Sequence, residues 1–139
     1  MDGGLYNAIA EFNTALRMII RTVAKGFPSD PDVEQANRRS LVAIDIDPVI
    51  GIKLVGEYMY HFRDQILVRD ETFFIANDYE TQLRAGTDEN QVTLVAKLIP
   101  KLKIFIRTLG PEERDDYWDI IIDMLRYYSI FRQHYRRPQ

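Results

Sequence analysis

The sequence PEERDDYWDIIIDMLRYYSIFRQHY occupies residues 111–135 and sets the helical character of the chain. Its apolar side chains recur every three or four positions, which places them on one face of an α-helix. This face consists of Tyr117, Ile121, Met124, Tyr128, Phe131 and Tyr135, and it is widened by Trp118, Ile122 and Leu125. An ordinary surface helix needs a narrower apolar face. We therefore expect this helix to be central to the fold or to bury surface against a partner.

The segment before this helix is predicted to form a second helix that packs beside it. Residues 89–109 carry one apolar stripe, made of Val92, Val95, Ile99, Leu102, Ile106 and Leu109. Pro100 interrupts the backbone hydrogen bonding of this segment and should kink it. Gly110 and Pro111 then end one helix and start the next. So short a connection predicts an antiparallel helical hairpin at the C-terminal end of the fold.

The N-terminal half shows the same helical periodicity and has start signals of its own. Asp30 and Asp47 each precede a proline, and an aspartate in this position caps the free amide groups of a first helical turn. The apolar spacing predicts helices over residues 4–25, 31–45 and 48–67, and a short helix over 71–76. With the two C-terminal segments, the sequence predicts an all-α fold, a single-domain bundle of about five helices over residues 1–139.

Two glycines lie within the predicted helix 48–67. Gly51 and Gly56 each weaken a helix by about 1 kcal/mol relative to alanine. Glycine is useful at such positions where another element must approach the backbone closely. We therefore expect close packing by a neighbouring helix at both positions.

Residues 69–88 form a long connection that combines aromatic and turn-forming residues. Connections of this length are commonly either functional or mobile. Phe73, Phe74 and Tyr79 either hold the connection against the core or bind a partner. The candidate partner-binding residues are these three together with Trp118, Ile122 and Leu125.

The composition excludes several classes of function. The chain has 139 residues, with 18 Lys and Arg against 21 Asp and Glu, two His and no Cys. Without Cys there is no disulfide, no thiolate nucleophile and no Cys-ligated zinc or iron–sulfur site. The net charge of −3 argues against a protein that coats nucleic acid, because that affinity depends on excess basic charge. Neither a signal peptide nor a membrane-spanning apolar run is recognisable, so we expect an intracellular protein.

Three acidic groups have a spacing that a metal ion could use. The first is Glu57, His61 and Asp64, the second is Asp45 and Asp47, and the third is Asp116, Asp119 and Asp123. Each group has a simpler interpretation, respectively a solvated helix face, a helix cap, and negative charge near a positive helix N-terminus. We therefore expect no metal ion and no cofactor.

Motifs for nucleophilic catalysis are not found in the sequence. Ser29, Ser40 and Ser129 all lie outside a Gly-x-Ser-x-Gly elbow. The sequence has neither a Gly-rich phosphate loop nor a His-Glu-x-x-His pair. We expect no catalytic residues and do not expect an enzyme.

Charge is segregated in the C-terminal half. The predicted helix 89–109 has four cations between Gln91 and Pro111 and no acid there, namely Lys97, Lys101, Lys103 and Arg107. The next helix begins with acidic residues, including Asp115, Asp116, Asp119 and Asp123. An antiparallel hairpin would bring these charges side by side, so we expect them to pair within the chain rather than to form a site for an external phosphate.

A second basic group lies at the C-terminal end and has no such local partner. It consists of Arg126, Arg132, Arg136 and Arg137, and it alternates with Tyr127, Tyr128 and Tyr135. Arginine with aromatic residues forms a workable surface for nucleic acid or for a protein partner. Helix-dipole compensation and solubility explain the same residues nearly as well.

Two motifs carry a resemblance to a known group of proteins. They are Phe27-Pro28-Ser29-Asp30 and Asp70-Glu71-Thr72-Phe73-Phe74, and between them Asp47-Pro48 stands where Asn-Pro is expected. At this spacing, residues 5–75 resemble short all-helical proteins of unassigned function from large DNA viruses of algae and protists. The resemblance implies a small component of the virion or virus factory, in a host cell, that acts through contacts. It implies no catalytic residues.

Two functional hypotheses follow from the sequence. The first is a non-enzymatic structural or adaptor protein that binds a protein partner or forms a homo-oligomer, including a minor virion component. The second is a nucleic-acid-associated regulatory protein that uses the C-terminal arginines and tyrosines.

Overall fold

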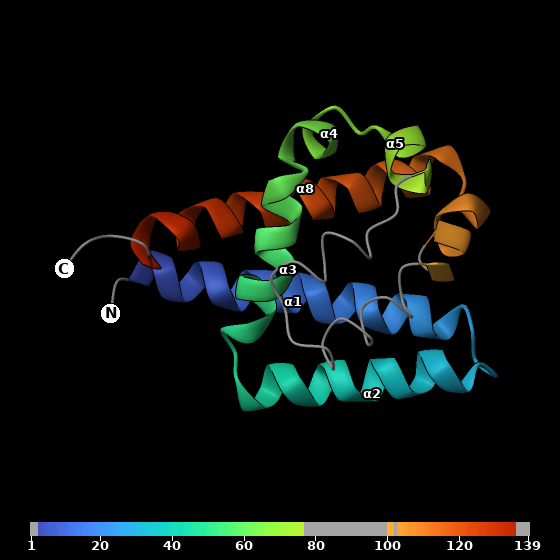
Figure 1. Cartoon of the computed structure of the whole chain (residues 1–139), viewed down its shortest axis with the longest axis horizontal. Helices are drawn as coiled ribbons and strands as arrows, with labels where there is room; N and C mark the ends of the chain where they lie inside the picture. The colour runs from blue at the N-terminus through green and yellow to red at the C-terminus, as the bar shows by residue number, and fades with distance from the viewer. Residues whose placement is uncertain (1–2, 77–99, 102, 136–139) are drawn as a thin grey trace.

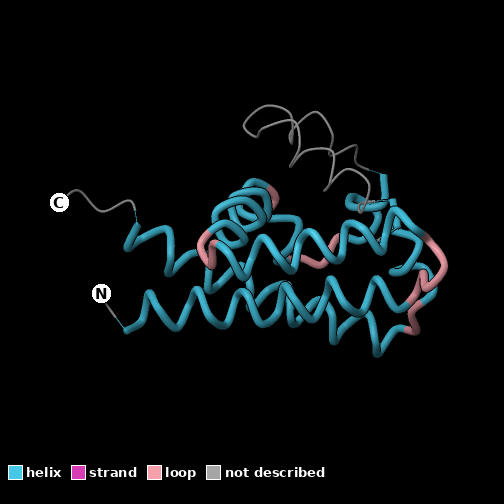
Figure 2. The backbone as a smooth tube through the Cα atoms, turned by 90° about the horizontal axis from the view of Figure 1, so that it is seen from below, coloured by secondary structure: helices cyan, strands magenta, loops and turns pink. Residues whose placement is uncertain are grey.

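The computed structural model describes residues 3–76, 100–101 and 103–135. Within these ranges all regular structure is α-helical, which confirms the predicted all-α class (Figures 1 and 2). The helices are α1 (Gly3–Lys25), α2 (Pro31–Ile46), α3 (Ile50–His61), α4 (Arg63–Leu67), α5 (Glu71–Ala76) and α8 (Pro111–Tyr135). Residues 103–108 are also helical. None of the helices in this part of the chain is long and apolar enough to cross a membrane.

The two long helices α1 and α8 form the centre of the bundle. They run antiparallel, with the start of α1 and the end of α8 on the same side of the molecule, and they make the most extensive packing among the described helices (Figure 1). Helix α2 packs along α1, and α3 packs against both α1 and α8. The main buried cluster therefore joins α1, α2, α3 and α8, and consists of Phe12, Leu16, Ile44, Ile52, Met124, Tyr128 and Phe131.

Asp30 acts as the sequence predicts, whereas Asp47 does not cap α3, which begins at Ile50 with Val49 as its N-cap. The Asp30 carboxylate accepts hydrogen bonds from the backbone amides of Asp32 and Val33, at 3.0 and 3.2 Å, and so caps α2. The Asp47 carboxylate accepts one from the amide of Val49 at 3.1 Å, just before α3. The two bonds to Asp30 satisfy amide groups that a helix leaves free in its first turn, whereas the bond to Asp47 closes the turn between α2 and α3.

Close packing at the two helical glycines is confirmed. A Cβ atom on Gly56 would lie 2.8 Å from Cγ of Tyr128 and closer still to Cδ1, because the tyrosine ring lies directly against this part of α3. A Cβ atom on Gly51 would lie 3.0 Å from Cδ2 of Leu16. The glycines therefore allow α3 to approach α8 and α1 closely.

The expected helix over residues 48–67 is interrupted. It divides into α3 and α4 at Phe62, whose φ and ψ are −108° and 24°. The Phe62 amide donates to the Met59 carbonyl at 3.0 Å, a tighter turn than in an α-helix. The Phe62 side chain is buried, and its ring contacts the ring of Phe73 at 5.7 Å. The packing of this ring provides a physical reason for the change of direction.

The expected C-terminal hairpin is only partly within the described residues. Residues 89–99 and 102 lie outside them, and the predicted kink at Pro100 therefore also falls outside the described residues. In the described part, the rings of Phe105 and Tyr117 contact each other at 5.7 Å. Among the described helices, α8 packs most extensively on α1, a pairing that the sequence pattern did not predict.

Candidate functional site

The predicted partner-binding residues gather in a second buried cluster. Leu125 is only 5% exposed and packs with Phe62 and Ile66. The half-buried residues around them include Phe73, Phe74, Trp118 and Ile122. Leu125 therefore lies in the interior and cannot form part of an exposed surface, whereas the four half-buried residues join α5 to α8. Tyr79 lies outside the described residues.

Ring contacts hold the short helix α5 in place. The rings of Phe73 and Phe74 meet edge to face at 5.3 Å, and Phe74 contacts Trp118 at 5.7 Å. Such aromatic pairs contribute about 0.5–1.5 kcal/mol each beyond their buried area. Phe62 and Ile66 were not predicted as parts of this cluster, although their spacing on the predicted helix 48–67 was a usable signal.

Polar contacts hold the same helix. The Glu71 carboxylate accepts hydrogen bonds from Nη1 of Arg114 at 3.3 Å and from Nε1 of Trp118 at 3.4 Å. The Asp70 carboxylate accepts one from the amide of Phe73 at 3.0 Å and so caps the helix. The Asp-Glu-x-Phe-Phe motif therefore has a structural role, since its charged and aromatic side chains all help to dock α5.

Arg69 forms a second connection to α8. Its Nη1 donates to the Asp115 carbonyl at 3.3 Å, and its Nη2 forms an ion pair with the Asp119 carboxylate. The hydrogen bond with Asp119 is the main reason why the pKa of Arg69 is raised. Arg69 also has a φ of 54°, a left-handed conformation that non-glycine residues rarely adopt.

These contacts correct the expected charge pairing in the C-terminal half. The partner of Asp115 and Asp119 is Arg69, which precedes α5, rather than a described cation of the expected helix 89–109. Lys101 instead pairs with Asp30, with 2.6 Å between Nζ and Oδ2. The sequence pattern does not indicate these pairs, because both join distant parts of the chain.

Leu67, the last residue of α4, and the turn residues Val68 and Arg69 make up a segment that we call the α4–α5 corner. Leu67 is 57% exposed and Val68 is 73% exposed, although both are large and apolar. The turn is closed by hydrogen bonds from the amides of Arg69 and Asp70 to the carbonyls of Ile66 and Gln65, each at 3.0 Å. The fold thus fixes two adjacent apolar side chains in solvent.

Substitutions at Arg69 should separate its backbone role from its side-chain role. We expect Arg69→Ala and Arg69→Gly both to destabilise the fold, because each removes the ion pairs to α8. We expect the glycine variant to be the more stable of the two by about 1 kcal/mol, since glycine adopts the left-handed conformation without steric cost. Urea unfolding monitored by circular dichroism measures the difference. Equal midpoints for the two variants would contradict the proposed backbone role.

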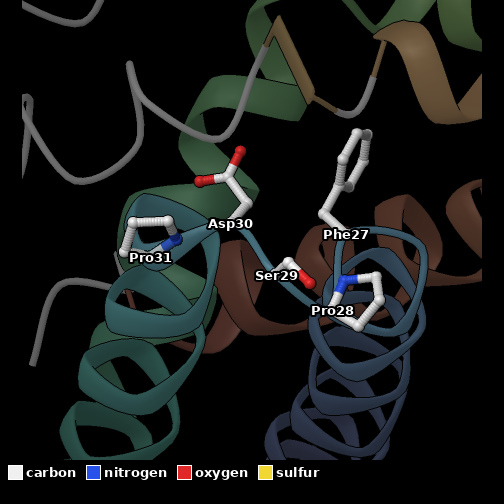
Figure 3. A pocket seen from close by; sticks show the side chains of 5 residues that line it. All are labelled: Phe27, Pro28, Ser29, Asp30 and Pro31. Carbon is white, nitrogen blue, oxygen red and sulfur yellow. The ribbon is translucent and has the colours of Figure 1, made fainter.

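A shallow hollow lies at the turn between α1 and α2. It is lined by Phe27, Pro28, Ser29, Asp30 and Pro31, and the side chains of Phe27 and Asp30 extend to the same side of the turn (Figure 3). The Lys101 ammonium lies 5.4 Å from the centre of the Phe27 ring and pairs with Asp30. The Phe-Pro-x-Asp motif therefore caps α2 and binds a lysine from a distant segment.

Acid should weaken this turn. The hydrogen bond from Lys101 is the largest cause that lowers the pKa of Asp30 below its ordinary value of 3.8. A lowered pKa means that the carboxylate stabilises the fold fully above pH 3.8, and that this contribution is lost as the pH falls through the folded-state pKa. We expect Asp30→Asn to be less stable than the wild type at neutral pH, and the difference to shrink below pH 3.8. Thermal melts across this range test the prediction, and a difference independent of pH would contradict it.

The acidic groups with a possible metal spacing have other contacts. Glu57 accepts a hydrogen bond from the hydroxyl of Tyr128, and Asp45 pairs with Arg17 at 3.0 Å. Asp123 pairs with Arg126 at 3.3 Å. Within the described ranges, no three His, Asp or Glu residues come together in a way that could hold a metal ion.

The C-terminal arginines do not form one continuous surface in the described residues. Arg126 is exposed and pairs with Asp123, whereas the Arg132 guanidinium lies over the Tyr60 ring, with its carbon 3.9 Å from the ring centre. The two arginines are six positions apart, which places them on different faces of α8. Arg136 and Arg137 lie outside the described residues.

The fold and these contacts define an all-helical protein whose motifs position its own helices. Comparison with known proteins finds a relative from a large DNA virus: 81 residues are 28% identical to an uncharacterized protein of African swine fever virus. The match covers 58% of this chain and 56% of the relative, so the chain spans about half the length of the protein it matches. No protein-family model and no solved structure matches the chain.

Proposed function

We propose that this is a non-enzymatic structural or adaptor protein of a large DNA virus, which acts through protein–protein contacts. In this proposal it works inside the host cell, in the cytoplasm or nucleus, and is a minor component of the virion. It belongs with the small helical proteins of algal and protist viruses that its motifs resemble. The observation that carries the proposal is the exposed pair Leu67 and Val68 at the α4–α5 corner.

The corner has the physical properties of a protein contact. Burial of apolar surface is favourable by about 25 cal/mol per Å², so a partner that covers both side chains gains free energy. The backbone of the corner is already fixed by its own hydrogen bonds and by the ion pairs of Arg69. A fixed surface loses less conformational entropy when it binds.

The charged residues of the described chain support a role based on contacts. Asp30 caps a helix and binds Lys101, Glu71 docks α5, and Glu57 binds Tyr128. Each of these carboxylates thus has a structural use. Nucleic-acid binding receives less support, because Arg126 pairs with Asp123 and is on a different face of α8 from Arg132.

The proposal predicts that association depends on the α4–α5 corner. We expect Leu67→Asp/Val68→Asp to weaken association by about 2 kcal/mol, roughly thirtyfold, because two apolar side chains can no longer be buried. Sedimentation velocity at micromolar concentration measures self-association, and chemical cross-linking in producing cells measures binding to other proteins. The free energy of unfolding should change little, since both side chains are already exposed.

A matched control comes from the other side of the bundle. Val42 and Ile46 of α2 are 50% and 78% exposed, so Val42→Asp/Ile46→Asp introduces the same charges at comparable exposure. We expect this control to associate as the wild type does. A wild-type chain that stays monomeric and cross-links to no protein, or two double variants with equal losses, would contradict the proposal.

A further inference from the structure

Two arginines from different helices converge on one tyrosine. The guanidinium carbon of Arg63, at the start of α4, lies 4.4 Å from the centre of the Tyr60 ring, and that of Arg132, on α8, lies 3.9 Å from it. Because both distances share one ring centre, the two guanidinium carbons are at most about 8 Å apart. The ring is a favourable position for a cation, since its faces carry negative charge.

The two guanidinium groups are held firmly but have no counter-charge in the described part of the chain. Arg63 also donates from Nη1 to the Tyr60 carbonyl at 2.9 Å. Arg17, Arg38, Arg69, Arg114 and Arg126 have carboxylate partners, whereas five other arginines have none among the described residues. Of these five, Arg21, Arg39, Arg63, Arg107 and Arg132, it is Arg63 and Arg132 that lie against one ring. The nearby Glu57 accepts from Tyr128, whose ring lies 5.8 Å from that of Tyr60.

We propose that Arg63 and Arg132 form an oxyanion-binding site, and that its ligand is an Asp or Glu carboxylate in an acidic segment of a protein partner. A carboxylate accepts charge-assisted hydrogen bonds from a guanidinium group, and arginine matches its planar geometry. With at most about 8 Å between the two guanidinium carbons, neighbouring carboxylates of one acidic segment can each meet one of the two cations at this ring. The bound anion also relieves the repulsion between the two like charges. This inference rests on the proposed function, because it names the chemistry of one contact between this chain and the proposed protein partner.

The surroundings favour a protein carboxylate over the phosphates of nucleic acid. Nucleic-acid affinity grows with the number of phosphates that are neutralised, whereas this site supplies two cations. The Tyr60 ring is already occupied by guanidinium groups, so it offers little surface for a base to stack upon.

Binding of a short fluorescent oligo-glutamate peptide to the full chain tests the site. We expect salt-sensitive binding in fluorescence anisotropy, and a loss of about tenfold in affinity for Arg63→Gln/Arg132→Gln. The matched control is Arg38→Gln/Arg126→Gln, which removes the same charge from two exposed arginines that have their own carboxylate partners. The control should bind within about twofold of the wild type.

A milder variant keeps the test valid if the glutamine variant folds poorly. Arg63→Lys/Arg132→Lys retains both charges but lacks the planar donor fork, so we expect an intermediate loss of affinity. Absence of wild-type binding, or equal losses in the test and control variants, would overturn the site. The alternative result is that a short single-stranded oligonucleotide binds more tightly than the peptide and depends on Arg63 and Arg132. That result would contradict a protein ligand and assign the site to nucleic acid. The α4–α5 corner is intact in these variants. A variant that loses peptide binding but still associates through the corner therefore distinguishes a failure of this site from a failure of the proposed function.

Discussion

Gly56→Ala is expected to destabilise the fold by at least about 2 kcal/mol, although alanine is the better helix former. The added Cβ atom would lie within 2.9 Å of three atoms of the Tyr128 ring. Tyr128 is itself buried in the main cluster, so its ring cannot move aside without disturbing Phe131 and Met124. The clash should therefore separate α3 from α8. Urea unfolding monitored by circular dichroism measures the loss.

The same substitution at an open position is the control for Gly56. A Cβ atom added to Gly3 would have no neighbouring atom within 4 Å, so Gly3→Ala should leave the stability unchanged or slightly raised. A double-mutant cycle adds a second check, because Gly56→Ala should cost less in a Tyr128→Leu background, where the smaller side chain leaves room. A Gly56→Ala variant as stable as the wild type would show that α3 does not pack on α8 in this way.

Phe12→Ala should destabilise the fold by about 3–5 kcal/mol. Phe12 is fully buried at the centre of α1, where it packs with Leu16 of the same helix and residues of α3 and α8. The loss has two causes, the transfer of apolar surface and the cavity that remains. A domain of this size is stable by about 5–15 kcal/mol, so a measurable fraction of the variant should unfold near physiological temperature.

An exposed aromatic residue on the same helix is the control for Phe12. Tyr6 is 67% exposed, and Tyr6→Ala should change the free energy of unfolding by no more than about 0.5 kcal/mol. Comparable losses at the two positions would contradict the orientation of α1 in the bundle.

Local rules explain why much of the helical structure is predictable from the sequence. The carboxylate of Asp30 and the ring of Pro31 act within a few residues, so the start of α2 follows from the sequence alone. Apolar side chains recur every three or four positions throughout residues 111–135, and α8 covers the same residues in the structure. The interruption at Phe62 has no such local signal, because it accompanies the packing of the Phe62 ring against another helix, α5.

The candidate site was less predictable because it depends on contacts between distant residues. The period of α8 shows that Trp118 and Leu125 are on an apolar face, but not that this face is covered by α4 and α5 of the same chain. The pairing of Arg69 with Asp119 spans 50 positions. The exposure of Leu67 and Val68 likewise follows from the turn that Arg69 closes, and their sequence alone indicates burial.

Site-specific photo-cross-linking in the cells where the protein assembles tests the central claim most directly. A photoreactive amino acid is placed either at Leu67 in the α4–α5 corner or at Val42 on α2, both of which are exposed. A chain that acts through protein contacts at the corner should give a discrete protein cross-link from position 67 and not from position 42. Cross-links to nucleic acid, equal protein cross-links from both positions, or no cross-link from position 67 would contradict the claim.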